Sequence, residues 1–164
     1  MKEIKMEPNT DPNQVADRVR EQSAAESNRK IDRETEGRLL RYAGMSKEEI
    51  TRRIEDLERE WDMERLLETN ASALTVGAMA AFAATRSRKW LFVPGVVMSF
   101  FFQHAVQGWC PPVPVFRRAG IRTRQEIERE RYALKVLRGD FDGTSEYMGD
   151  AGATTERALR AVRA

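Results

Sequence analysis

The chain has 164 residues, of which 33% are charged, and its formal net charge is only +2. A balance so close to neutral gives no overall field that would attract nucleic acid, and no basic stripe with interleaved aromatic residues is present, so we expect no nucleic-acid partner. Its single cysteine excludes an intrachain disulfide, and residues 1–15 lack the apolar run of a secretory signal peptide. The charges are segregated, because residues 71–84 and 90–109 contain no Asp, Glu, Lys or Arg.

Residues 1–13 predict a flexible tail, since Pro8 and Pro12 interrupt any regular element. Residues 14–65 predict a charged helical region, because they are dense in Lys, Arg, Asp and Glu. Its first part, 15–42, favours a weakly buried helix, although a partly disordered arm is the alternative because few apolar side chains are available to offset the entropy of ordering.

A second charged helix is expected to begin at Ser46, because Glu49 stands three residues later and completes a capping box. Its apolar positions form a narrow stripe that should pack on the first helix or on a second copy: Ile50, Ile54, Leu57 and Trp61. No Pro or Gly interrupts residues 47–76, so this helix is predicted to continue into the first apolar segment.

Residues 66–110 predict a transmembrane helical hairpin. A helix would place Trp90 and Trp109 about 28 Å apart, close to the roughly 30 Å thickness of the hydrocarbon layer, and tryptophan favours the membrane–water boundary. The first apolar segment, Ala71 to Ala84, spans only about 21 Å as a helix. An alanine-rich helix buried in a soluble bundle is therefore the alternative for that segment.

Small residues recur at four-residue spacing on one face of the first apolar helix, at Ala73, Gly77 and Ala81, and Gly95 and Ser99 offer a matching face on the second. Small side chains allow helix backbones to approach closely inside a membrane, so these five residues are candidate helix-packing positions. The alternative is that the alanines simply fill a helix.

Three polar residues, Gln103, His104 and Gln107, lie inside the second apolar segment, where polar side chains usually face protein. They predict hydrogen bonding between helices near one interface. A metal or haem site joining His104 to Cys110 across copies would have too few ligands, so we expect neither a metal nor a cofactor. A redox or acyl-carrying role for Cys110 would require a nearby base or a lowered pKa, and His104 lies about 9 Å away along a helix.

Residues 111–139 predict a proline-rich strip followed by an amphipathic helix. Pro111 and Pro112 end the second apolar helix, and Pro114 should keep the strip extended. Thr123 and Glu126 form a second capping box, and Gly139 ends the helix, whose apolar side carries Ile127, Leu134, Val136 and Leu137. Residues 140–164 predict a flexible C-terminal tail, of which 154–164 form either a short basic helix or a frayed end.

After the two-helix apolar region the chain carries Cys110, Pro111, Gly120, Ile121 and Thr123. With these residues the region from 61 to 123 resembles the YgaP-like transmembrane domain, a bacterial inner-membrane family of unknown function. The interval from Cys110 to Gly120 is longer than in the family, so the chain resembles a divergent member. The resemblance implies a fold and an inner-membrane location, and it implies no activity.

Together these features predict an all-α, non-enzymatic membrane protein that self-associates or scaffolds an unknown protein partner. Arginines flank both outer ends of the apolar region, which predicts cytoplasmic termini although the turn between the apolar helices is also basic. They are Arg52, Arg53, Arg59, Arg65, Arg117, Arg118, Arg122 and Arg124. The alternatives are a redox or ligand-binding membrane accessory that uses Cys110, and a soluble helical oligomer that buries both apolar segments.

Overall fold

The computed structural model describes residues 17–142 and 151–163. This part of the chain is helical and contains no strand, which confirms the all-α prediction. The predicted N-terminal tail, 1–13, lies outside the described residues. The helices are α1 (Arg18–Glu21), α2 (Ala25–Tyr42), α3 (Lys47–Arg59), α4 (Met63–Thr85), the 3-10 turn η1 (Arg88–Leu91), α5 (Phe92–Gln107), α6 (Val113–Arg118), α7 (Arg124–Arg138) and α8 (Ala151–Arg163).

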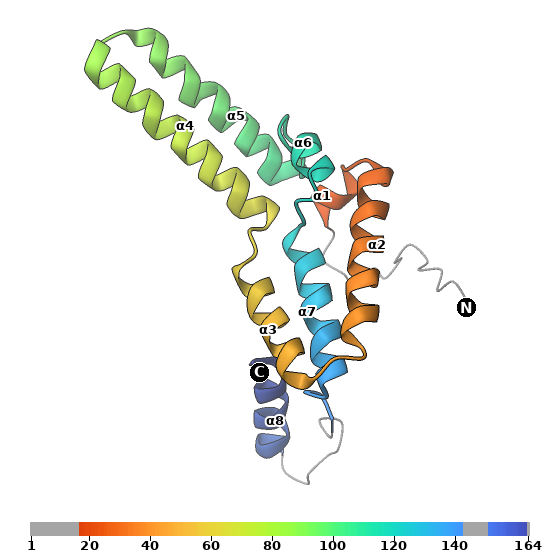
Figure 1. Cartoon of the computed structure of the whole chain (residues 1–164). Helices are drawn as coiled ribbons and strands as arrows, with labels where there is room; N and C mark the ends of the chain where they lie inside the picture. The colour runs from red at the N-terminus through yellow and green to blue at the C-terminus, as the bar shows by residue number, and fades with distance from the viewer. Residues whose placement is uncertain (1–16, 143–150, 164) are drawn as a thin grey trace.

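The molecule consists of a long arm and a helical body (Figure 1). Helices α4 and α5 pack along each other in opposite directions, with η1 at the tip, and we call this pair with its turn the arm. Helices α1, α2, α3, α6 and α7 lie together at its base and form the body, in which α7 packs against both α3 and α2.

The apolar core of the body lies between α3 and α7. Ile50, Ile54 and Leu57 of α3 pack with Ile127 and Leu134 of α7. The predicted stripe on α3 is therefore real, and its partner is chiefly α7. Trp61 does not belong to it, because it lies beyond the end of α3 and is 44% exposed. Val136 and Leu137 are likewise exposed, so the apolar side of α7 is narrower than predicted.

Local capping signals act as the sequence indicates. The side chain of Ser46 accepts a hydrogen bond from the backbone N–H of Glu49, and the reciprocal bond completes a capping box. Thr123 and Glu126 form the same motif at the start of α7. Gly139 ends α7 in the left-handed conformation that glycine adopts without a steric penalty.

The prediction of one continuous helix from residue 47 into the apolar segment is wrong. Helix α3 ends at Arg59, and Glu60 is extended. Asp62 then caps α4 by accepting a hydrogen bond from the backbone N–H of Arg65 at 2.8 Å. An aspartate can satisfy a free helix N-terminus, so a break occurs here without Pro or Gly.

The prediction of an extended strip around Pro114 is also wrong. Pro112 occupies the N-cap position of the short helix α6, and Pro114 lies in its first turn, where the missing backbone N–H costs no hydrogen bond. The N-terminal polar segment is likewise divided into α1 and α2. In the C-terminal segment, where the sequence left a short helix or a frayed end open, the structure contains α8.

Candidate functional site

Most apolar side chains of the arm are exposed or only partly buried. In α5 only His104 is buried, and in α4 only Met63, Leu67 and Ala78 are. Among the described residues one helical segment, Arg88–Gln107, is long and apolar enough to cross a membrane, and it comprises η1 and α5. The large exposed apolar side chains of the arm are Leu74, Val76, Met79, Trp90, Leu91, Phe92, Val96, Met98, Phe100, Phe102 and Val106.

The three tryptophans lie at the two ends of the arm. Trp90 belongs to η1 at the tip, whereas Trp61 directly precedes α4 and Trp109 follows α5 at the base. The guanidinium of Arg65 lies over the ring of Trp61, with 4.5 Å between its central carbon and the ring centroid. An aromatic ring beside a cation at the end of an apolar helix is an arrangement favoured at membrane–water interfaces.

The predicted small-residue face of α4 is largely open in the single chain. Ala78 is the buried alanine of α4, whereas Ala73 and Gly77 are exposed and Ala81 is half-buried. A Cβ atom added to Gly77 would meet nothing within 4 Å. The Ala73–Gly77–Ala81 face is therefore an unoccupied surface of the single chain.

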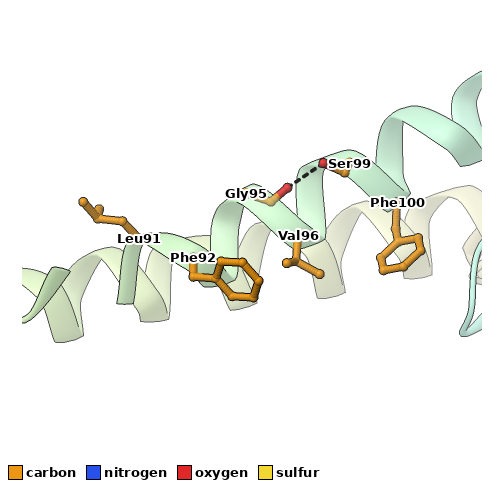
Figure 2. Close-up of a pocket in the computed structure, with 6 residues that line it drawn as sticks. All are labelled: Leu91, Phe92, Gly95, Val96, Ser99 and Phe100. Carbon is orange, nitrogen blue, oxygen red and sulfur yellow. Dashed lines mark hydrogen bonds between the residues drawn. The ribbon is translucent and has the colours of Figure 1, made fainter. Parts of the chain in front are cut away.

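The second predicted packing face is also open. Gly95 and Ser99 lie in a shallow apolar depression on α5, together with Leu91, Phe92, Val96 and Phe100 (Figure 2). The hydroxyl of Ser99 donates a hydrogen bond to the carbonyl of Gly95 at 2.8 Å, so it is satisfied within its own helix. The structure does not bring the two small-residue faces together within one chain.

The predicted polar trio separates into two environments. Gln103 donates a hydrogen bond to Gln107 at 3.4 Å along the same helix. His104 is buried on α5, and its Nδ1 has no hydrogen-bond partner among the described residues. The groups of His, Cys, Asp and Glu in this part of the chain include none that could hold a metal ion.

The base of the arm is locked to α1. Gly108 ends α5 with a φ of 77°, and a Cβ atom there would approach the backbone carbonyl carbon of Arg18 to 2.6 Å. The guanidinium of Arg18 donates hydrogen bonds to the carbonyls of Ala105 at 2.9 Å and Val106 at 3.2 Å. Arginine thus satisfies carbonyls that the end of α5 leaves without helical partners.

Cys110 belongs to an apolar cluster beside this junction. It is 3% exposed and packs with Val19, Met63, Leu67 and Val113. Burial raises the pKa of its thiol, which disfavours the thiolate that redox or acyl chemistry would need. In this setting Cys110 is a small core residue.

The other residues of the predicted family motif shape the chain after the arm. Pro111 is exposed, and Gly120 adopts a φ of 90° between α6 and α7. Ile121 packs on the apolar cluster around Cys110. Thr123 is buried and caps α7. Gly120, Ile121 and Thr123 therefore have structural roles between α6 and α7.

A buried ionic core, which the sequence analysis did not identify, joins the helices of the body. Glu126 of α7 accepts two hydrogen bonds from Arg117, at 2.6 and 2.8 Å, and one from Arg20 at 2.6 Å. Arg20 also pairs with Asp32 at 2.6 Å. This half of the core links α1, α2 and α6 to the start of α7.

The second half is centred on Glu130, whose side chain is completely buried. It is paired with three arginines: Arg38 of α2 at 3.0 Å, Arg53 of α3 at 2.9 Å, and Arg122. Arg122 also forms a two-pronged pair with Glu60, at 2.5 and 2.8 Å. Such fork-to-fork contacts fix geometry as well as charge.

One sequence signal for this core does exist. Glu130 lies between Ile127 and Leu134 at spacings of three and four, so it falls on the apolar face of α7. A carboxylate on a core face must find partners or remain neutral.

We expect the body to lose stability in acid. Burial alone would raise the pKa of Glu126, but hydrogen bonding and the charge of Arg117 outweigh it, and the pKa lies below its usual value. The pKa of Glu130 is lowered in the same way, against the effect of burial, by Arg38, Arg122 and Arg53. The two carboxylates contribute fully to the free energy of unfolding above their unfolded-state pKa of about 4.3. This contribution is lost as the pH falls through their lower pKa in the folded protein.

The measurement is the thermal midpoint of the body, followed by circular dichroism in detergent between neutral pH and about pH 2. The midpoint should be steady down to about pH 5 and fall below about pH 4. A variant carrying both Glu126→Gln and Glu130→Gln should show a lower midpoint at neutral pH and a flatter profile. A wild-type midpoint independent of pH would contradict this assignment.

No family model matches this chain, and neither a curated protein nor a solved structure matches it. The resemblance to the YgaP-like transmembrane domain therefore stays a prediction.

Proposed function

We propose that this protein is a small, non-enzymatic membrane protein whose arm inserts as a two-helix transmembrane hairpin, with the body on the cytoplasmic side. The observation that carries the proposal is the exposure of α5. A helix this apolar would normally be buried in a soluble protein, yet its large side chains point outward. Exposed apolar side chains along most of a helix mark a surface that contacts a membrane or a partner.

The dimensions of the arm support a bilayer as its environment. The segment 88–107 is about 30 Å long as a helix, which equals the usual hydrocarbon thickness. The charged residues of α4 are confined to its first two turns, at Glu64, Arg65 and Glu68, so its remaining length is compatible with the same layer.

The orientation is part of the proposal. Arginines beside the base outnumber the basic residues at the tip, which are Arg86, Arg88 and Lys89, so the base is assigned to the cytoplasm. The family resemblance adds a bacterial inner membrane as the location. A reporter active only in the cytoplasm should work after Ala164, and one active only outside should work after Arg86.

The proposed biochemical role is self-association or scaffolding of a membrane partner. The Ala73–Gly77–Ala81 face and the Gly95–Ser99 depression are both open in the single chain. Small residues on lipid-facing helices permit close contact with another helix, and a second copy supplies both faces.

Alkaline carbonate extraction of membranes tests insertion. We expect the protein to remain in the pellet, because the exposed apolar surface of the arm would be costly to transfer to water. Recovery in the soluble fraction would overturn the hairpin proposal and favour a soluble oligomer that buries the apolar helices.

The Gly77→Leu substitution tests self-association. Leucine should hold a second helix away from this face and reduce cross-linked dimer several-fold, while the thermal midpoint in detergent stays unchanged because Gly77 does not contact α5. Ala83→Leu is the matched control, since Ala83 is exposed on another flank of α4. Equal cross-linking in both variants would show that the small face meets lipid.

A further inference from the structure

Helix α6 lies at the end of the body from which the arm projects. Figure 1 shows it beside the base of α5, whereas the last turn of α2 lies at the far end of the body. Val113 fixes this position, because it is completely buried in the cluster that contains Met63 and Leu67 of α4. The arm and α6 are thus held in one place by the same apolar contacts.

The outer side of α6 is apolar and basic. Pro111 and Pro112 are exposed just before it, and Val115 is 62% exposed within it. Arg117 turns inward to the ionic core, whereas Arg118 is exposed. Exposed apolar side chains with an arginine beside them are suited to the boundary between lipid chains and headgroups, where the apolar groups leave water and the guanidinium meets phosphate.

We infer that α6 is a membrane-interface element, which rests on the bilayer beside the base of the arm with Val115 in the headgroup region and Arg118 paired with anionic lipid phosphate. This inference rests on the proposed insertion of the arm. Its occupant is a lipid surface, because Val113 packs α6 on the apolar base of the arm and Arg118 offers a positive charge where an anionic leaflet would lie. Trp109, which follows α5, and the Trp61–Arg65 pair, at the start of α4, also lie at the base of the arm.

Fluorescence quenching in reconstituted vesicles tests the inference. An environment-sensitive fluorophore is attached to single cysteines at Val115→Cys, at Met98→Cys in the middle of α5, and at Leu40→Cys on α2, each in a Cys110→Ala background. The vesicles contain phosphatidylglycerol and lipids with a nitroxide in the headgroup or in mid-chain. We expect the probe at 115 to be quenched most by the headgroup nitroxide, the probe at 98 by the mid-chain nitroxide, and the probe at 40 by neither.

The quenching results distinguish the inference about α6 from the proposed insertion of the arm. Quenching at 98 but none at 115 overturns the inference about α6 and leaves the insertion of the arm supported. Absence of quenching at 98 overturns the insertion itself, and with it the inference.

The charge of Arg118 gives a second readout. Arg118→Glu should lower headgroup quenching at 115 several-fold in phosphatidylglycerol vesicles and little in phosphatidylcholine vesicles. Arg41→Glu, an exposed site at the far end of α2, is the matched control. An equal effect of Arg118→Glu in both lipids would overturn the assignment of Arg118 to anionic phosphate.

Discussion

Replacing Glu130 by alanine is expected to destabilise the body by about 3–5 kcal/mol. The substitution removes the carboxylate that Arg38, Arg53 and Arg122 share, and it leaves three guanidinium groups close together in a region that excludes water. Removing one partner of a buried ionic group costs far more than the net value of the pair, because the remaining charges are left uncompensated.

The measurement is thermal unfolding of the body in detergent, with carbonate extraction as a parallel readout that should not change because Glu130 lies outside the arm. Glu55→Ala is the control, since Glu55 is exposed and its ion pair with Arg59 is 4.0 Å long. It should cost less than about 1 kcal/mol. Equal melting of the two variants would mean that the ionic core does not hold the body together.

Gly108→Ala is expected to detach α1 from the base of the arm. Alanine at a φ of 77° carries a conformational cost of roughly 1–3 kcal/mol. The added Cβ would also lie 2.6 Å from the backbone of Arg18, which cannot rotate away as a flexible side chain can. Overpacking of this kind adds about 1–3 kcal/mol.

Gly120→Ala separates the two causes. Gly120 has a comparable φ of 90°, but a Cβ there meets nothing within 4 Å. It should therefore show the conformational cost without the collision. We expect faster proteolysis near α1 and a lower thermal midpoint in Gly108→Ala than in Gly120→Ala. Equal proteolysis and equal thermal midpoints in the two variants would show that the backbone of Arg18 moves away easily and that this contact does not hold α1 to the arm.

Features that depend on neighbouring residues could be predicted from the sequence. Ser46 with Glu49, Thr123 with Glu126, and the stop at Gly139 each act within one turn of helix, so the residues that decide them are adjacent in the chain. The stripe Ile50, Ile54 and Leu57 also emerged from periodicity alone, although its partner helix did not.

Features that depend on distant residues could not be predicted. Glu130 is paired with arginines from three other parts of the chain, and a sequence rich in Arg and Glu does not indicate which pairs are buried. The break before Asp62 contains neither Pro nor Gly, and an aspartate in a charged sequence does not by itself indicate a new helix start. Ala78 is buried and Gly77 is exposed because of the way α5 lies against α4. The spacing of small residues along the sequence does not specify that arrangement.

The contact between Gly108 and α1 limits the order in which the protein can fold during translation. Arg18 bonds to a carbonyl 87 positions later, and Arg20 to a carboxylate 106 positions later. The N-terminal helices leave the ribosome first, yet their binding surfaces do not exist until α5, α6 and α7 have been synthesised. Closure of the body consequently occurs only on a chain whose arm is already complete.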